Sequence, residues 1–459
     1  MRNYTIRHLL AAIGTDTKSL PGALCDRAFS GVSTNTRTVR PGDVFFGIRG
    51  ERFDGGTFAG NALSAGAALA IVNRDTPVDA APVVRVDDTV RALGDAARDY
   101  RSRFTGKVVA VTGTNGKTTV KEMLLAVLGR RFRTHGTAGN LNNHIGLPLS
   151  VLGLTDDHEC AVFELGMSAP GEIGYLADIA KPDIGIILNA GPAHMEFFGS
   201  LDRIADAKTE LLRALAPEKT AVMNGDDPLL RARENGARCR IVRFGVETAA
   251  EFRAEDIEIG PEGAASFRVG ETTVALKVPG RHNVYNALAA WSAGRLLGLD
   301  SAEIADALGG FRAPEMRLQT VEADGVRFIN DSYNANPLSM RAAADVLRNT
   351  TIPRGGRLIV VLGDMRELGE ISGSAHEEIG GLFGGLRPAL LLLVGGNASF
   401  YREGALRSGL DAGVIHMFGT TAEAVPALTN MKRPGDVIFL KGSRALGLER
   451  LIPIRDGEF

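Results

Sequence analysis

One pattern recurs along this chain and limits the folds open to it: a short apolar run that ends in a cluster of glycine, asparagine or aspartate. Runs this apolar leave no side for solvent, so we expect strands that are buried on both faces in parallel sheets covered by helices. Such sheets bind ligands beyond the carboxyl ends of their strands, where these polar clusters stand. The runs are VVAVTG (108–113), CAVFELG (160–166), IGIILNAG (184–191), AVMNGDD (221–227), RLIVVLGD (357–364), ALLLLVGG (389–396) and VIFLKGS (437–443).

The distribution of these runs predicts an α/β protein with three domains. A chain of 459 residues exceeds the length of about 150 residues that is typical of one domain. Residues 1–86 hold short strand-like pieces between Gly and Pro and predict a small N-terminal α/β domain. We expect a central domain with a mostly parallel sheet at 87–313 and a C-terminal Rossmann-like α/β domain at 314–459. Alternating residues near 250–280 predict antiparallel strands, and a helix should follow over 280–299.

Composition excludes several classes of protein. Hydrophobic residues make up 44% of the chain and the formal net charge is −2, so no basic excess is present to attract nucleic acid. No segment reaches the roughly 18 apolar residues of a membrane span, and the early run at 9–14 is too short for a signal peptide. Cys25, Cys160 and Cys239 fit neither a disulfide framework nor a CxxC metal site. We therefore expect a cytoplasmic protein with reduced, mostly buried thiols.

A phosphate-binding loop is predicted between the strand VVAVT and the amphipathic helix that follows it. Gly113 and Gly116 allow backbone angles and a close approach that a Cβ would block, so that loop N–H groups can face phosphate oxygens. Lys117 adds a charge near the β and γ phosphates, and Thr118 offers a hydroxyl to Mg²⁺. Val111 stands where the general Walker pattern has its first glycine. ATP is the expected ligand, and a tight turn beside a surface lysine is the alternative.

Two candidate cation ligands follow predicted strands. Glu164 ends the run CAVFE, where an unpaired carboxylate would be costly to bury, and His194 follows the run IILNAG. An exposed strand-end glutamate and a loop histidine with satisfied hydrogen bonds are the alternatives. Because Mg²⁺ prefers oxygen ligands, Glu164 and Thr118 suit it better than His194 does.

Lys208 lies in the segment LDRIADAKTELLRAL, which predicts one helix. On a helical wheel the lysine is centred on the apolar face, so its amine would be desolvated and more easily neutral. A lysine that covers the core with its methylenes while its amine reaches water is the alternative. The apolar face comprises Leu201, Ile204, Leu211, Leu212 and Leu215, and the opposite face Asp202, Arg203, Asp206 and Glu210.

Together these motifs resemble the Mur ligase family, and the resemblance covers nearly the whole chain. NDSYNANP and GDMRELGE resemble most closely the members that add a terminal dipeptide. Other Mur or folylpolyglutamate-type ligases, a P-loop kinase and a nucleotide-gated binding protein are the alternatives. The matching segments are TGTNGKTT, GNLNNHIGLPLSVL (139–152), FELGMSAPGEI (163–173), NAGPAHMEFFGSLDRIADAKTEL (189–211), GRHNVYNALAA (280–290), NDSYNANPLSM (330–340), VLGDMRELGE (361–370) and LKGSRALGLE (440–449).

The resemblance implies an ATP- and Mg²⁺-dependent amide ligase of peptidoglycan synthesis, on which cell shape and division depend. It would join D-alanyl-D-alanine to UDP-N-acetylmuramoyl-tripeptide through an acyl phosphate, as a monomer. It also implies that CO₂ carbamylates Lys208, which then helps to hold a second Mg²⁺. The implied catalytic residues are Lys117, Glu164, His194 and Lys208, and the implied metal contacts are Thr118, Glu164, Lys208 and His194. The implied ATP contacts are Gly113, Thr114, Asn115, Gly116, Lys117, Thr118, Thr119, Asn283, Arg317 and Asp331.

The resemblance further implies contacts with the remaining substrates. The segment GVSTNTRTVRPGDVFFGIRGERFDGGTF resembles the family's uridine-diphosphate-binding region, with Ser33 and Arg37 as contacts and Asn35 where the family often has an acidic residue. Asn334 and Asn336 are the implied contacts in the C-terminal domain. A solvated arginine at position 37, an N-cap at Asn283 and a turn at 336–337 are the alternatives. The segment LKGSR carries Lys441, Ser443 and Arg444, which suit the carboxylate of the incoming dipeptide.

Overall fold

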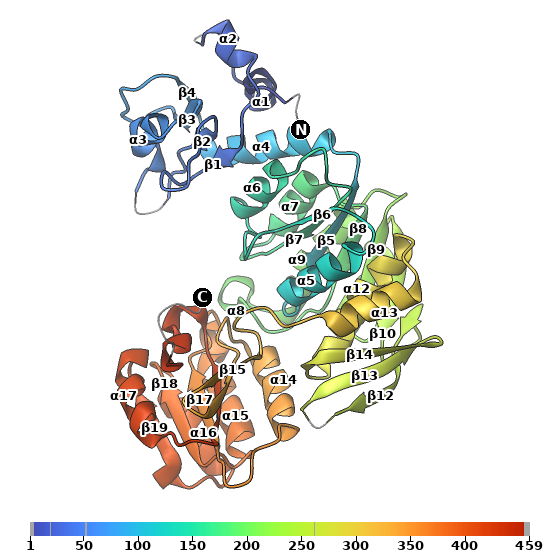
Figure 1. Ribbon diagram of the computed structural model, residues 1–459, viewed down its shortest axis with the longest axis vertical. Coiled ribbons are helices and arrows are strands. Elements are labelled where there is room, and N and C mark those ends of the chain that lie inside the picture. The colour runs from blue at the N-terminus through green and yellow to red at the C-terminus, as the bar shows by residue number, and fades with distance from the viewer. Residues whose placement is uncertain (1–3, 19, 51–52, 261, 454–459) are drawn as a thin grey trace.

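The computed structural model of this chain describes residues 4–18, 20–50, 53–260 and 262–453. Its described strands form four sheets, which follow one another along the chain and lie in three domains arranged along the long axis of the molecule (Figure 1). No sheet among the described residues mixes strands from two of the predicted domain ranges, and the α/β class is confirmed. The domain limits themselves stay predictions.

The N-terminal domain contains a parallel sheet in the order β1-β2-β3-β4. Helix α4 begins after Asp88, whose side chain accepts hydrogen bonds from the N–H groups of Val90 and Arg91. Its apolar side chains join one continuous hydrophobic core that extends from this sheet to the central domain. The elements within residues 1–86 are α1 (Ile6–Ala12), α2 (Gly22–Cys25), β1 (Val32–Ser33), β2 (Val44–Phe46), α3 (Ala59–Ser64), β3 (Leu69–Asn73) and β4 (Val83–Val86), and α4 (Thr89–Ser102) follows as the first helix of the predicted central range.

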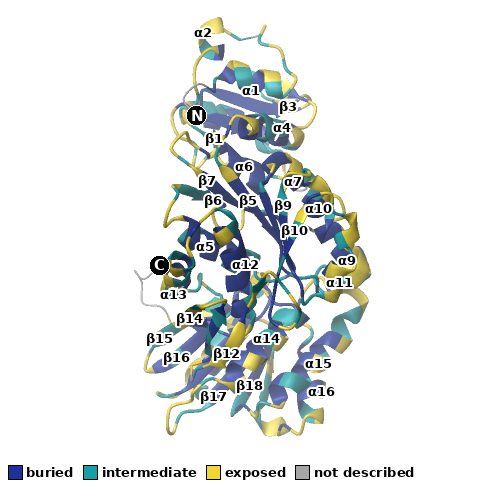
Figure 2. Cartoon of the chain, turned by 90° about the vertical axis from the view of Figure 1, so that its right-hand side faces the viewer, coloured by how far each residue is buried: buried dark blue, intermediate teal, exposed yellow. Residues whose placement is uncertain are grey.

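The central domain is built on a parallel sheet in the order β11-β10-β9-β8-β5-β7-β6. Its central strands are buried along their length beneath helices, as Figure 2 shows in dark blue. The strands are β5 (Lys107–Thr112), β6 (Thr134–Gly136), β7 (Cys160–Glu164), β8 (Ile184–Ile187), β9 (Thr220–Asn224), β10 (Arg240–Gly245) and β11 (Phe252–Arg253). The helices are α5 (Lys117–Leu128), α6 (Gly146–Leu152), α7 (Glu172–Ala180), α8 (Met195–Phe198), α9 (Leu201–Lys208), α10 (Glu210–Ala214), α11 (Pro228–Arg231), α12 (His282–Leu296) and α13 (Ser301–Gly310).

The predicted antiparallel region and the helix after it are both confirmed. Strands β12 (Glu255–Ile259), β13 (Ala264–Val269) and β14 (Thr272–Pro279) form an antiparallel sheet, and α12 follows. The alternate side chains of β13 and β14 are buried in the core that also holds α5 and α12. This second core fixes the helix of the phosphate loop from its outer side.

The C-terminal domain is a six-stranded sheet in the order β15-β16-β20-β17-β18-β19, in which β15 alone of the described strands pairs antiparallel. The short 3₁₀ helix η3 (Gly369–Ile371) follows β17. The strands are β15 (Gln319–Ala323), β16 (Val326–Asn330), β17 (Leu358–Gly363), β18 (Leu390–Val394), β19 (Ile415–Phe418) and β20 (Val437–Lys441). The helices are α14 (Pro337–Arg348), α15 (Ser372–Gly384), α16 (Ala398–Arg407) and α17 (Thr421–Met431).

The structure corrects one helix prediction and confirms the thiol prediction. The segment expected to be one helix from Leu201 is divided into α9 and α10 at Thr209, whose hydroxyl donates to the carbonyl oxygen of Ala205. Leu201, which was expected on the buried face, is 38% exposed because it begins the helix at the surface. The three cysteines are buried and unpaired, as predicted. Within the described residues, no helix combines the length and the apolar character needed to cross a membrane.

Candidate functional site

The predicted phosphate loop connects the carboxyl end of β5 to the first residue of α5. Gly116 adopts a left-handed backbone conformation with φ of 88°, and a Cβ at this position would collide with the side-chain oxygen of Asn286. A Cβ on Gly113 would lie 2.8 Å from Cβ of Leu188. The backbone N–H of Asn115 donates to Oδ1 of Asn189 at 2.9 Å, which ties the loop to the end of β8. Neighbouring strand ends therefore set the shape of the loop.

Lys117 is held over its own loop. Its ammonium group donates to the carbonyl oxygens of Gly113 at 2.9 Å and of Thr114 at 3.3 Å. Burial lowers the pKa of Lys117, the carboxylate of Glu164 opposes this shift, and the guanidinium of Arg317 adds to it. The amine therefore occupies a partly dehydrated position at the amino-terminal end of α5, where an anion would find a charge and a helix dipole together.

Glu164 is buried at the end of β7, with 2% of its surface exposed. Its Oε2 accepts a hydrogen bond from the Thr118 hydroxyl at 2.9 Å, and its Oε1 accepts one from the Asn142 amide at 2.8 Å. The exposed strand-end alternative is therefore wrong. A hydroxyl and a carboxylate in contact beside the phosphate loop are oxygen groups of the kind that Mg²⁺ prefers.

Lys208 ends α9 and is 3% exposed. Within the described part of the chain, its amine makes neither a hydrogen bond nor an ion pair. Burial lowers the pKa of Lys208 well below its usual value, and the positive charge of Lys117 lowers it further. A snorkelling lysine would keep its amine in water, so this alternative is not supported.

The C-terminal domain reaches over the phosphate loop through two predicted residues. Arg317 donates to the Thr118 hydroxyl at 2.9 Å, and its guanidinium lies 4.2 Å from the ring centroid of Tyr333. The side-chain amide of Asn336 donates to that of Asn115 at 2.8 Å. Asn336 also caps α14 by accepting the N–H of Ser339, so it begins a helix directly and contacts the opposite domain, while its contact with substrate stays a prediction.

A cavity of about 900 Å³ lies between the central and C-terminal domains. Among the predicted site residues, Gly113, Lys208, Ser33 and Arg37 do not line it. The predicted residues that line it are Thr114, Asn115, Gly116, Lys117, Thr118, Thr119, Glu164, His194, Asn283, Arg317, Asp331, Asn334 and Asn336. The structure thus gathers most of the predicted nucleotide and metal contacts around one space.

Two predicted contacts have partners within the protein. Asp331 lies 2.5 Å from the ammonium group of the buried Lys441, and it also accepts the backbone N–H of Leu318. Lys441, which suited a dipeptide carboxylate, is thus neutralised by a carboxylate of the same domain. Ser443 accepts the N–H of Arg366, and Arg444 pairs with Glu449 at 2.5 Å. All three residues line the cavity, and their contact with the carboxylate of the dipeptide stays a prediction.

Asn283 does not cap its helix, because α12 begins one residue earlier and its N-cap, Arg281, makes no side-chain cap. The Asn283 amide donates to the carbonyl oxygen of Pro279 at 2.7 Å and accepts from the amide of Asn286 at 2.8 Å. Because Asn286 packs against the backbone of Gly116, this pair connects the cavity wall to the phosphate loop. The N-cap alternative is wrong, and the contact with the ATP base stays a prediction.

His194 immediately precedes α8 and has a left-handed backbone with φ of 57°. Its Nδ1 lies 2.5 Å from Oε2 of Glu367, a residue of the C-terminal domain. Apart from this contact, the buried Nδ1 atom has no hydrogen-bond partner among the described residues. Contact with His194 holds the pKa of the Glu367 carboxyl below its usual value. The sequence reasoning missed Glu367, although it lies in the quoted motif GDMRELGE after a buried strand.

Lys121 is a second residue that the sequence reasoning missed. It is buried on α5, and its ammonium group donates to the carbonyl oxygens of Thr137 at 2.8 Å and of Gly139 at 3.3 Å. The Thr137 hydroxyl in turn accepts the backbone N–H of Glu164. Lys121 thereby connects the helix of the phosphate loop to the strand end that carries the carboxylate. Its place on the helix of the phosphate loop, directly after the apolar Val120, is the signal that could have found it.

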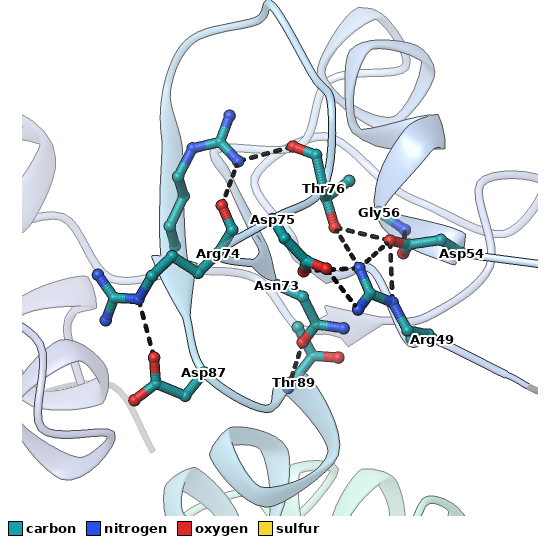
Figure 3. Close-up of polar contacts among 10 residues, drawn as sticks. Arg49, Asp54, Gly56, Asn73, Arg74, Asp75, Thr76, Asp87 and Thr89 are labelled. Atoms are coloured by element: carbon teal, nitrogen blue, oxygen red, sulfur yellow. Dashed lines mark hydrogen bonds and ion pairs between the residues drawn. The ribbon is translucent and has the colours of Figure 1, made fainter.

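The predicted uridine-diphosphate contacts lie in the N-terminal domain, away from the cavity. The Ser33 hydroxyl is buried and donates to the carbonyl oxygen of Asn35, while Arg37 is exposed. Figure 3 shows a polar network in the same domain, in which the Arg49 guanidinium contacts Asp54 at 2.7 Å and Asp75 at 2.8 Å. These contacts join Arg49 and Asp54 to the segment that follows β3.

Comparison with known proteins gives the class to which this fold and site belong. The model of the Mur ligase middle domain matches residues 111–294, and that of the Mur ligase, glutamate ligase domain matches residues 316–444. The model of the Mur ligase family, catalytic domain matches residues 28–101. The chain belongs to the Mur ligase family.

Two relatives with high identity to this chain carry the same name. UDP-N-acetylmuramoyl-tripeptide--D-alanyl-D-alanine ligase of Bacillus subtilis (strain 168) is 38% identical over 426 residues, which cover 92% of each chain. The ligase of the same name from Escherichia coli (strain K12) is 38% identical over 77% of this chain and 79% of its own.

Solved structures of MurF have a fold similar to that of this chain. A crystal structure of MurF from Acinetobacter baumannii has a TM-score of 0.87 and 35% identity, and covers 98% of this chain and 97% of its own. MurF ligase from Thermotoga maritima in complex with ADP has a TM-score of 0.79 and 31% identity, and covers 92% and 96%.

Proposed function

We propose that this chain joins D-alanyl-D-alanine to UDP-N-acetylmuramoyl-tripeptide with ATP, giving UDP-N-acetylmuramoyl-pentapeptide, ADP and phosphate. The observation that carries the proposal is the phosphate loop and its buried Glu164, which open on a cavity of about 900 Å³ that the C-terminal domain covers. The proposal extends to this chain the substrates named for its relatives. It places the reaction in the cytoplasm and treats the chain as a monomer.

The chemistry follows from the weakness of a carboxylate as an acyl donor. An oxygen of the tripeptide's terminal carboxylate attacks the γ-phosphorus of ATP, and the bond between that phosphorus and ADP breaks. The amine of D-alanyl-D-alanine then attacks the carbonyl carbon of the acyl phosphate. Phosphate leaves with the electrons of the carbon–oxygen bond, and the amine loses a proton. In both steps the protein has to align the reacting groups and stabilise negative charge, and it need not form a covalent bond with the substrate.

The phosphate loop would supply that stabilisation. The ammonium of Lys117 now donates to the loop carbonyls of Gly113 and Thr114, and it can exchange these neutral acceptors for phosphate oxygens. Arg317 contacts the Thr118 hydroxyl from the opposite domain, so a second cation would meet the same phosphates when the domains are closed. Charges fixed in a partly dehydrated site need little reorganisation during the reaction.

The residues beside the loop fit Mg²⁺. Thr118 and Glu164 present a hydroxyl and a carboxylate in contact, and phosphate oxygens and water would complete the coordination. When bound, Mg²⁺ neutralises the charge that builds up on the transferring phosphate. Glu164 is kept in place by the Asn142 amide and, through the backbone, by Thr137.

Lys208 would act as a carbamate. Burial of an amine without a hydrogen bond or an ion pair in the described chain favours its neutral form, and the neutral amine is the form that reacts with CO₂. The resulting anion would attract the positive charge of Lys117 and help to hold a second Mg²⁺. Ser33 and Arg37 would contact the uridine-diphosphate end of the substrate in the N-terminal domain.

An assay of phosphate release and product mass tests the proposed function. We expect phosphate and the pentapeptide to form one for one, and only when ATP, Mg²⁺, UDP-N-acetylmuramoyl-tripeptide and D-alanyl-D-alanine are all present. Product with a single amino acid or with a folate acceptor in place of the dipeptide would point to another ligase of the fold. Phosphate release without either peptide substrate would contradict the ligase assignment.

Lys117→Ala tests the phosphate loop in the same assay, and Lys277→Ala is its control. Loss of a charge that contacts the transferring phosphate should raise the barrier by about 3 kcal/mol or more, which is over a hundredfold in rate. Lys277 lies on the exposed face of β14 and does not line the cavity, so Lys277→Ala should keep full turnover. Near-normal turnover of folded Lys117→Ala would contradict the assignment of the phosphate loop.

A further inference from the structure

A contact between the central and C-terminal domains joins two residues with unfavourable backbone angles. His194 and Glu367 both have left-handed conformations, with φ of 57° and 62°, which are uncommon for residues other than glycine. Each lines the cavity, and each comes from a loop after a buried strand, β8 or β17. Such conformations persist where surrounding contacts enforce them, and they concentrate at functional sites.

The contact has three parts. Nδ1 of His194 lies 2.5 Å from Oε2 of Glu367, and the backbone N–H of Glu196 donates to the carbonyl oxygen of Glu367 at 3.2 Å. Gly369 lies so near that a Cβ built on it would be 3.2 Å from Cα of Glu196. Backbone contacts of Glu196 with Glu367 and Gly369 thus hold the two loops together beside the side-chain contact, although 48% of the Glu367 side chain is exposed.

We infer that Glu367 is a positioning residue, which orients the imidazole of His194 toward the reacting phosphate only when the C-terminal domain is closed. The inference rests on the proposed function and on the catalytic role that the resemblance to the Mur ligase family implies for His194. A carboxylate in contact with one ring nitrogen of a histidine restricts the direction in which the other nitrogen can point. Because Glu367 belongs to the other domain, His194 would be correctly oriented only after closure, which protects ATP from hydrolysis in the open form.

Glu367→Gln tests the inference, with Glu370→Gln as the matched control. Glu370 is an exposed glutamate on the same loop, and it neither lines the cavity nor makes a hydrogen bond or ion pair among the described residues. We expect Glu367→Gln to lower kcat by about 10- to 100-fold while KM for ATP changes by less than about threefold, and Glu370→Gln to change neither. Glu367→Asp, which keeps the charge, should recover part of the loss.

A double-mutant cycle shows whether Glu367 acts through His194. In a His194→Ala background, Glu367→Gln should have little further effect on kcat, because the residue that it positions is gone. A full additional loss in that background would overturn the inference, as would equal kcat values for Glu367→Gln and Glu370→Gln. Thermal unfolding of each variant within about 2 °C of the parent protein would confirm that the folds are comparable.

A measurement without turnover separates this inference from the proposed function. Small-angle scattering with ADP and Mg²⁺ should show compaction of the parent protein and of Glu370→Gln, and a smaller compaction of Glu367→Gln. Equal compaction of all three would overturn the part of the inference that concerns closure. If the parent protein makes no pentapeptide, the proposed function fails, and the scattering result still decides whether Glu367 joins the domains.

Discussion

Lys208 is a buried amine whose charged form is unfavourable at its position. A lysine that is 3% exposed, beside the positive charge of Lys117 and without an anion in contact, destabilises its own charged form. Replacement by an apolar residue would remove that cost, yet the chain keeps the amine. A neutral amine that is converted to an anion by CO₂ would reverse the sign of the interaction with Lys117 from repulsion to attraction.

We expect Lys208→Ala to abolish turnover in a protein that stays folded. The physical reason is that the variant loses the anion that would help to place Mg²⁺, so the rate should fall by about a hundredfold or more, as for loss of one transition-state contact. Small carboxylates such as formate or acetate should restore part of the activity, because they can occupy the space that the carbamate leaves. Steady-state phosphate release with and without added carboxylate measures both effects.

The parent protein provides the complementary measurement. After incubation with ¹³C-bicarbonate, its NMR spectrum should contain a carbamate carbon signal that Lys208→Ala lacks and that the control Lys277→Ala retains. An active parent protein without this signal, or Lys208→Ala with most of its turnover in CO₂-depleted buffer, would show that the carbamate role is wrong.

At the level of single residues, the sequence was informative where function depends on local order along the chain. Gly116, Lys117 and Thr118 are neighbours in sequence, and a strand and a helix on either side fix their geometry. Partners from distant segments were not predictable in this way. Asp331 pairs with Lys441 and His194 pairs with Glu367, and both pairs form only when separate loops meet.

Asp226, in the turn after β9, is another residue whose partners come from distant segments of the chain. Asp226 accepts hydrogen bonds from the backbone N–H groups of Val246, Glu247 and Thr248, and from the Tyr285 hydroxyl. These contacts hold the end of β10 and helix α12 against the cavity that Asp226 lines. They lower the pKa of Asp226 to about 2, against the opposing effect of burial.

We expect Asp226→Asn to destabilise the central domain by about 1 to 2 kcal/mol at neutral pH, after allowance for solvent screening. Because the folded pKa is lower than the unfolded pKa of about 3.9, the stabilisation is fully present above the unfolded value. It is lost as the pH falls through about 2. The difference between parent and variant should therefore be greatest above about pH 5 and shrink as the pH approaches 2.

The single tryptophan, Trp291, is buried in α12 and makes the measurement specific to this domain. Urea unfolding followed by tryptophan fluorescence gives the free energy of unfolding of the parent protein and of Asp226→Asn. The difference between the two proteins is measured at pH 7 and again at pH 3. Asp306→Asn is the control, because Asp306 forms an ion pair with Arg130 at the surface and should contribute little at either pH. A difference between parent and Asp226→Asn that does not depend on pH would contradict the account.

Among the elements, the apolar runs predicted the buried strands because their composition is determined by burial on both faces. The division of the predicted helix into α9 and α10 was not visible in the helical periodicity, which continues through Thr209 in sequence. The break depends on the Thr209 hydroxyl, which donates to the carbonyl oxygens of Ala205 and Asp206. A local side-chain-to-backbone contact of this kind competes with the helix and is decided by the surrounding packing.

At the scale of the whole molecule, the structure is one in which the C-terminal domain meets the phosphate loop. Arg317 contacts Thr118, Asn336 contacts Asn115, and Glu367 contacts His194. The expectation of three domains followed from the sequence pattern, but these particular contacts did not. Domain closure depends on surface complementarity between segments far apart in sequence, for which hydrophobic periodicity carries no signal.

If catalysis requires the domains to open and close, a covalent link across this contact should stop turnover. A Cβ on Gly369 would lie 3.6 Å from Cβ of Glu196, within the range found in disulfides. We therefore expect Glu196→Cys combined with Gly369→Cys to form a disulfide in the closed form. The native Cys25, Cys160 and Cys239 are buried and should not compete for it.

The oxidised double variant should lose at least about tenfold in steady-state turnover, because substrates enter and products leave through the open form. Dithiothreitol should restore the rate to that of the reduced variant, and neither single-cysteine variant should respond to it. The reduced variant itself would carry a modest strain at position 369, where φ is 56°, and it is therefore the proper reference for the oxidised one. Full crosslinking with undiminished turnover would show that opening is not part of the cycle, whereas failure to crosslink under oxidising conditions would show that the contact between Glu196 and Gly369 is rarely formed in solution.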